Sequence, residues 1–192
     1  MRKSFCSLIS FLLFSLLACG AASAHWYVAP TGNDANNGSK RKPLKTIAAA
    51  LQRVNPGDTV FLREGSYGEF VVPTRSGKPG KMITLKSYPG EIAKIDGSDL
   101  YIKGWGNALV QVNNIDYMQF ENLHICHAHD SENNTDPEGI YITGTSGNIT
   151  FRGCKVYDIK NDCPLVDAKG DWRSAHAILV LGTDDNTPIR NL

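Results

Sequence analysis

The sequence has no large excess of charge of either sign. Its 192 residues include 20 lysines and arginines against 19 aspartates and glutamates, which gives a formal net charge of +1. Nucleic-acid-binding domains need a basic face, so this balance argues against DNA or RNA as a partner. It remains compatible with a neutral or acidic sugar polymer that meets the protein at one locally charged groove.

The chain also lacks any apolar run of the ~20 residues that a membrane-spanning helix needs. Its most apolar stretch, Leu8 to Leu17, follows two basic residues and precedes Ala22-Ser23-Ala24, which is the pattern of a secretory signal peptide. We therefore expect residues 1–24 to be removed and the rest to be secreted, extracellular or periplasmic, as one nearly neutral domain. An alternative stays open, because the residues ending at Cys19 resemble a lipobox and would anchor a lipoprotein.

Cysteine is scarce, and two of the five cysteines lie in the expected signal peptide. Cys126, Cys154 and Cys163 remain, an odd number. Cys154 falls on an inward position of the pattern described next, so we interpret it as a small core side chain. A disulfide between Cys126 and Cys163 is compatible with export, but the spacing alone does not decide it.

The sequence does contain a repeated unit of short alternating runs. In Gly139 to Val156, apolar residues alternate on either side of Tyr141 and of Thr150, and they continue after a corner at Gly153. Each run is too short to bury much surface alone. Such a unit is stable only when copies stack on it and share one core, which is typical of a solenoid.

Copies of this unit occur along the chain at growing intervals, as expected if strands are kept while corner loops lengthen. About five rungs are predicted in this way. In the second runs and the corner of the unit, Met118, Phe120, Asn122, Leu123 and Ile125 align in this order with Ile149, Phe151, Gly153, Cys154 and Val156. In the first runs, four pairs of residues align with Ile140 and Ile142: Val60 and Leu62, Ile83 and Leu85, Val110 and Val112, and Ile178 and Val180.

The segment before the first rung has the features of a cap. Thr46 is an expected N-cap for a helix whose Ile47, Leu51 and Val54 share one face, and Asn55-Pro56-Gly57-Asp58 ends it. A solenoid needs such a cap to cover the core of its terminal rung. We expect the cap to span residues 25–58 and the rungs to span residues 59–192.

Three motifs carry a resemblance to a known family: WYVAPTGNDANNGS, PLKTIAAAL and PGDTVFLREGSYGE, followed by ITLKSYPG and, much later, SAHAILVLGTDDNTPIRNL. Together they resemble right-handed parallel β-helix proteins of the pectate-lyase-like superfamily, closest to family 9 polysaccharide lyases. The resemblance implies an all-β right-handed parallel β-helix with an N-terminal capping α-helix. It also implies β-elimination on uronic-acid glycans such as pectate or alginate, with Ca²⁺ on the substrate carboxylate and a lysine as base.

The chain departs from that family at Asn191-Leu192, where it stops inside an expected strand. We therefore expect a truncated chain, monomeric unless its open last rung pairs. The family's lysine and calcium ligands cannot be matched to positions here, so candidates come from the long corners that would line a groove.

The first long corner runs from residue 127 to 138. Asp130, Asp136 and Glu138 carry the hard oxygens that Ca²⁺ prefers, and His129 is a candidate substrate contact. Together with His127 it could also serve a transition metal or act as a base. The alternative is a solvated loop rich in turn-forming residues.

The second long corner runs from residue 162 to 176. Lys169 or His176 is a candidate base, Arg173 suits a uronate carboxylate, and Trp172 suits a sugar ring. The alternative is that Trp172 packs over the corner while Arg173 pairs with Asp171. Beyond it, Asp184 and Asp185 are expected either to complete the metal site or to form a tight turn.

Two functions from different classes follow. The first is a secreted polysaccharide lyase, or a remnant of one, that acts on an acidic polysaccharide. The second is a non-catalytic β-helix that binds a glycan or serves as a surface structural protein. A glycoside hydrolase would need two facing carboxylates, and the sequence offers no assured pair.

Overall fold

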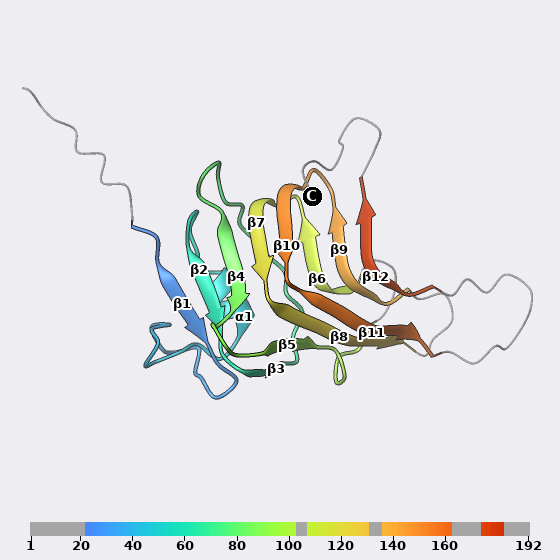
Figure 1. Cartoon of the computed structure of the whole chain (residues 1–192), viewed down its shortest axis with the longest axis horizontal. Coiled ribbons are helices and arrows are strands. Elements are labelled where there is room, and N and C mark those ends of the chain that lie inside the picture. The colour runs from blue at the N-terminus through green and yellow to red at the C-terminus, as the bar shows by residue number, and fades with distance from the viewer. Residues whose placement is uncertain (1–21, 103–106, 131–135, 163–173, 183–192) are drawn as a thin grey trace, which may run out of the picture.

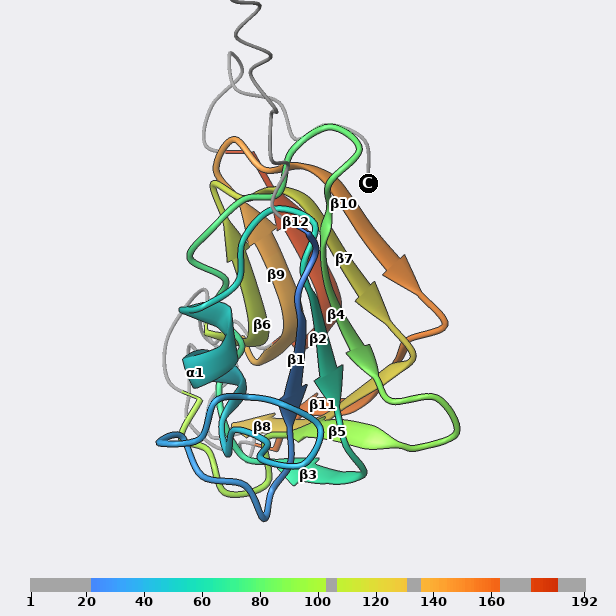
Figure 2. The same ribbon diagram turned by 90° about the vertical axis from the view of Figure 1, so that its left-hand side faces the viewer.

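A computed structural model describes residues 22–102, 107–130, 136–162 and 174–182. Almost all of their regular structure is parallel β-strand, and the strands form three sheets that run along one stack (Figure 1). The five-stranded sheet has the order β1-β2-β4-β7-β10, the four-stranded sheet β11-β8-β5-β3, and the three-stranded sheet β12-β9-β6. Figure 2 shows the sheets as the sides of a prism.

The strands of each sheet come from successive turns of the chain. The five-stranded sheet contains β1 His25–Val28, β2 Thr59–Leu62, β4 Ile83–Ser87, β7 Asp116–Glu121 and β10 Gly147–Arg152. The four-stranded sheet contains β3 Gly65–Tyr67, β5 Ala93–Asp96, β8 Leu123–Asp130 and β11 Lys155–Asn161. The three-stranded sheet contains β6 Ala108–Asn113, β9 Glu138–Thr143 and β12 His176–Leu181.

The all-β parallel β-helix predicted from the sequence is therefore confirmed. The described strands complete about four turns, slightly fewer than the five rungs expected, because the sequence pattern counts Ile83 and Val110 as separate rungs although β4 and β6 belong to the same turn. No helix among the described residues has the length and apolar character needed to cross a bilayer.

The predicted alignment of rungs holds in the later part of the chain. Met118 pairs with Ile149, Ile125 with Val156, and the same residue-by-residue register joins β6 to β9 and β9 to β12. The alignment predicted for the first rungs was wrong, because β2 and β4 lie in the five-stranded sheet and not in the three-stranded sheet that contains Val110 and Ile140. Ile83 pairs with Met118 in the five-stranded sheet and not with Val110, because alternating apolar runs look the same on every side of a solenoid.

The tight corner between the five-stranded and four-stranded sheets depends on the left-handed backbone region. Asn122 and Gly153 occupy equivalent corners with φ of 55° and 63°. A Cβ on Gly153 would lie 2.4 Å from Asn122 Oδ1, so the asparagine side chain fills the space that the glycine leaves. Asparagine and glycine are the residues that tolerate this conformation best.

The core runs through the middle of the prism and consists of stacked inward side chains. Phe120 is fully buried, and its ring stacks on that of Phe151 with centroids 4.6 Å apart and planes 4° apart. Cys154 packs against this core, as the sequence predicted. In the last described rung the covering is incomplete, since Ile178 and Val180 are 51% and 37% exposed.

The expected cap helix is present as α1, Ile47–Leu51, beside β1 and β2 (Figure 2). The Thr46 side chain accepts a hydrogen bond from the Ala49 amide, which confirms Thr46 as the N-cap. The carboxylate of Glu69 accepts hydrogen bonds from the amides of Ile47 and Ala48, which have no partner within the helix.

Phe120→Ala tests the stacked core. It should lower the free energy of unfolding by about 3–5 kcal/mol, because it leaves a cavity and removes the contact with Phe151. Urea denaturation measures the change. Phe61→Ala is the control: this ring stacks on Tyr27 outside the core, and its loss should cost only about 1 kcal/mol. An equal decrease in the free energy of unfolding in the two variants would contradict the prediction that the Phe120 stack stabilises the core.

Ile178→Lys tests the exposed apolar face of the last described rung. The chain should self-associate through this face, and a lysine there should reduce the association seen by light scattering. Val72→Lys replaces another exposed apolar side chain, 45% exposed, and should leave it unchanged. A wild-type chain that stays monomeric at high concentration would contradict the prediction.

Candidate functional site

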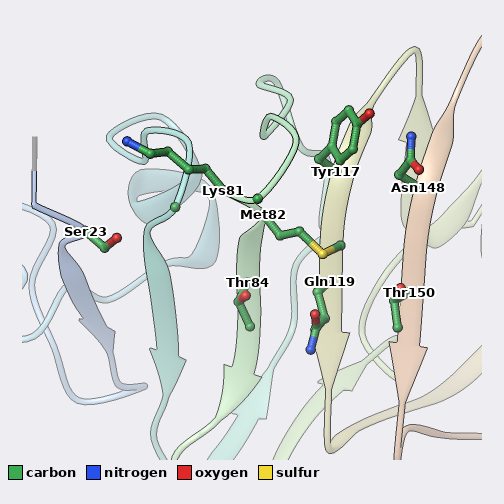
Figure 3. A pocket seen from close by; sticks show the side chains of 10 residues that line it. Ser23, Lys81, Met82, Thr84, Tyr117, Gln119, Asn148 and Thr150 are labelled. Atoms are coloured by element: carbon green, nitrogen blue, oxygen red, sulfur yellow. The ribbon is translucent and has the colours of Figure 1, made fainter. Parts of the chain in front are cut away.

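A groove crosses the outward face of the five-stranded sheet (Figure 3). Its volume is about 770 Å³. Thr84, Gln119 and Thr150 form its floor, and they are register partners on β4, β7 and β10, so their side chains lie in one row across the strands. Neighbouring parallel strands are about 4.8 Å apart, so the row offers polar groups at regular intervals along the stack. Such a surface suits an extended polymer.

One wall of the groove is formed by residues with a left-handed backbone conformation. Tyr117 and Asn148 have φ of 55° and 54° at equivalent positions of β7 and β10. A left-handed conformation is uncommon for a tyrosine and points to a demand from the fold or the site. Figure 3 shows the two side chains next to each other at one edge of the groove.

Lys81 supplies the positive charge of the groove. It lies in the turn before β4, where Lys78 and Lys81 form an isolated antiparallel bridge. Within the described residues its ammonium group makes no ion pair. This cation therefore remains available to a ligand.

A second charged row lies farther along the same strands and is held together by ion pairs. Lys86 forms an ion pair with Glu121, and Arg152 approaches the other oxygen of that carboxylate at 3.6 Å. The hydrogen bond from Lys86 lowers the pKa of Glu121 and outweighs its burial. Gln119 also donates to Glu121, which orients the amide on the groove floor. Glu121 thus acts as a support for the floor.

The groove is lined by polar groups that can bind a ligand. Its described lining contains hydroxyl, amide, phenol and ammonium groups and no carboxylate or imidazole. Sugar polymers are bound by such convergent polar groups next to an aromatic ring. Lys81 would favour an acidic sugar over a neutral one.

The residues predicted from the first long corner are partly described, and they do not lie in this groove. His129 points away from the core on β8, where its Nε2 lies 3.1 Å from Asp158 Oδ2 and its Nδ1 lies 3.9 Å from Asp162 Oδ2. It joins a histidine and aspartate cluster on the four-stranded sheet. Its role as a substrate contact stays a prediction.

Three of the candidates for calcium ligands lie among the described residues. Asp136 accepts two hydrogen bonds from Ser174, at 2.6 and 3.1 Å. Glu138 is fully buried at the start of β9, and Asp130 is buried at the end of β8. Among described residues, the one group of three metal-ligating side chains with ligand atoms within 4.8 Å of one another is a different one. The role of Asp130, Asp136 and Glu138 as calcium ligands stays a prediction.

The second corner is described only at its end. His176 begins β12 and is the register partner of Glu138 in the three-stranded sheet. The other predicted residues of the second and third corners lie outside the described residues: Lys169, Trp172, Arg173, Asp184 and Asp185. Their proposed roles remain predictions.

The groove residues were missed by reading the sequence for charged corners. The offset that places Met118 on Ile149 also places Tyr117 on Asn148 and Gln119 on Thr150, so their alignment was visible in the sequence. What the offset did not show is that residues 81 to 84 belong to the same side of the prism.

Together these features define a parallel β-helix with a polar groove on one of its sheets. The chain matches the family described as "Pel9A-like, right handed beta helix region" over residues 26–184, and it belongs to that family. The family resemblance predicted from the N-terminal motifs is confirmed.

Relatives of this chain include both lyases and a protein without assigned activity. It is 32% identical to the uncharacterized protein YwoF of Bacillus subtilis over 144 residues, covering 75% of this chain and 31% of the relative. It is 26% identical to pectate lyase PEL9 of Emericella nidulans over 147 residues, covering 71% and 34%. The chain thus spans about a third of the length of these relatives.

Solved structures show the same fold. The pectate lyase Pel9A structure is similar with a TM-score of 0.55 and 26% identity, covering 70% of this chain and 34% of that one. A GH136 lacto-N-biosidase from Eubacterium ramulus gives a TM-score of 0.60 at 18% identity, covering 85% and 31%, which supports the fold alone.

Tyr117→Ala and Lys81→Gln test the groove. Tyr117→Ala should weaken binding of polygalacturonate about tenfold, or about 1.4 kcal/mol, by removing the aromatic wall. Lys81→Gln should weaken binding of polygalacturonate and reduce its salt dependence, while a neutral glucan is unaffected. Titration calorimetry measures both. Tyr101→Ala removes a tyrosine that is 66% exposed outside the groove and should change neither; an equal loss there would contradict the assignment.

Proposed function

We propose that this chain is part of a secreted polysaccharide lyase that acts on uronic-acid glycans such as pectate or alginate. The observation that carries the proposal is the family match over residues 26–184. Two relatives that are named pectate lyases support it. Secretion is part of the proposal and rests on the signal-peptide pattern in residues 1–24.

The proposed reaction is β-elimination, and it sets demands on the side chains. A base removes the proton from the carbon next to the uronate carboxylate, the electron pair forms a C=C bond, and the glycosidic C–O bond breaks as its oxygen takes a proton. Negative charge that builds up on the carboxylate must be held by a cationic group. Lys169 or His176 is the proposed base, Arg173 the proposed carboxylate partner, and Trp172 the proposed sugar-stacking ring.

A Ca²⁺ ion is part of the proposal, and its proposed ligands are Asp130, Asp136, Glu138, Asp184 and Asp185. Among the described residues, none of these carboxylates belongs to the one group of metal-ligating side chains whose atoms lie within 4.8 Å of one another, and we assign no step of the reaction to Ca²⁺. Its contribution is left to the assay below.

The alternative is a non-catalytic glycan-binding β-helix. The observation that favours it is the groove on the five-stranded sheet, whose described lining has no acid or base pair. In this case the polymer would lie along the row of Thr84, Gln119 and Thr150 without being cut.

A single assay separates the two functions. The full chain is incubated with polygalacturonate and with alginate, with Ca²⁺ or with a chelator, and the ultraviolet absorbance of unsaturated uronates is followed. A lyase should generate this absorbance on one of the two polymers. Polymer binding without any absorbance would establish the glycan-binding alternative and overturn the lyase.

Base variants then test the residue roles. Lys169→Met or His176→Ala should reduce turnover by about a hundredfold or more if that residue is the base, with little change in polymer binding. His124→Ala, on the outward face of β8 and outside both corners, is the matched control. Full activity in both base variants would show that neither is the base.

A further inference from the structure

One column of side chains on the outward face of the four-stranded sheet is unusual in composition. Asp96, Cys126 and Tyr157 are register partners on β5, β8 and β11, three neighbouring strands of one sheet (Figure 1), so these residues follow one another along the stack. Cys126 is fully buried, yet it is not part of the hydrophobic core of the prism. Its thiol is a free one, covered from outside by its neighbours.

His127 completes this column because its backbone is turned. It has φ of 59°, and Asp158, at the equivalent position of the next rung, has φ of 54°. The turn brings His127 Nδ1 to 2.9 Å from Asp96 Oδ1, and its Nε2 lies 3.6 Å from Asp158 Oδ2. The imidazole therefore stands between two carboxylates of neighbouring rungs.

The resulting group has the dimensions of a metal site. Ligand atoms of Asp96, Cys126 and His127 all lie within 4.8 Å of one another. A tetrahedral ion with bonds of about 2.0–2.3 Å holds its ligand atoms about 3.3–3.8 Å apart, so small side-chain rotations are enough to close the site. Thiolate, imidazole and carboxylate are together a zinc-type set, whereas Ca²⁺ prefers oxygen alone.

The surrounding groups support a cation. Burial opposes ionisation of Asp96, but hydrogen bonds from Ser98 and His127 outweigh it and lower its pKa to about 2. Burial raises the pKa of the Cys126 thiol, which favours its neutral form. A bound divalent cation reverses that preference and deprotonates a coordinating thiol. The thiolate and Asp96 would then balance its two charges.

A hydrolytic triad is the competing interpretation, because a serine, a histidine and an aspartate lie together. Ser98 Oγ and Asp96 Oδ1 contact the same ring nitrogen of His127, at 3.1 and 2.9 Å. A relay needs the nucleophile and the carboxylate on opposite nitrogens. The geometry therefore does not support this reading.

We propose that Asp96, Cys126 and His127 form a transition-metal site of the zinc class on the outward face of the four-stranded sheet. Coordination by His127 Nδ1 leaves its Nε2 proton facing Asp158, the arrangement in which a carboxylate orients a ligating histidine. Three protein ligands leave a fourth position for water or another ligand. The site ties β5 to β8, and through Asp158 to β11, so metal binding stabilises the stack.

Cobalt titration of the full chain tests the proposal. The protein, treated with chelator and then freed of it, is titrated with Co²⁺ alone, and the thiolate-to-cobalt charge-transfer band and the visible d–d bands are recorded. Both should appear and saturate at one equivalent, and Zn²⁺ should abolish them by displacement. Zn²⁺ should also raise the melting temperature. Absence of a charge-transfer band would overturn the site.

Variants assign the ligands. Cys126→Ser should remove the charge-transfer band, His127→Ala should lose one-equivalent binding, and Asp158→Asn should weaken binding about 10- to 100-fold. Two variants are matched controls that should keep the band. His124→Ala removes a histidine on the same face of β8, and Cys154→Ser removes a thiol that packs against the core of the prism. Because circular dichroism and melting curves without metal report folding separately, a band retained in folded Cys126→Ser would overturn the assignment.

Discussion

The register between successive rungs is the constraint on which the rest of the structure depends. Parallel pairing of β7 with β10 places Phe120 on Phe151, and the same register continues in the other two sheets. Each rung alone has three short strands and buries little, so its stability comes from the rung above and the rung below. A shift by one residue would turn every inward side chain outward, which is why the apolar pattern and the pairing are locked together.

The same register also determines which outward-facing side chains lie next to each other on the surface of the prism. Where two successive rungs place a left-handed residue at the same position, the side chains of these two residues lie next to each other. This happens at Tyr117 and Asn148, at the edge of the groove, and at His127 and Asp158, in the proposed metal site. The fold thus builds a binding surface by repetition, with one contributing residue from each turn.

Reading the sequence recovered the solenoid, the cap helix with Thr46 as its N-cap, and the register of the later rungs. It did not recover the placement of Ile83, because a period-two apolar run is identical on each of the three sides and only long-range pairing tells them apart. For the same reason it singled out His129 but not the combination of Asp96 with Cys126. These two residues are far apart in the chain and adjacent only across the ladder.

The sequence by itself determined that this chain winds into stacked rungs, since short alternating apolar runs that recur along the chain bury their apolar faces by stacking on one another. It also determined the family, through motifs between residues 26 and 97. Only the tertiary structure decided which outward side chains meet. The contact of His127 with Asp96, for example, joins residues from different turns, and the distance between turns along the chain depends on loop lengths that carry no periodic signal.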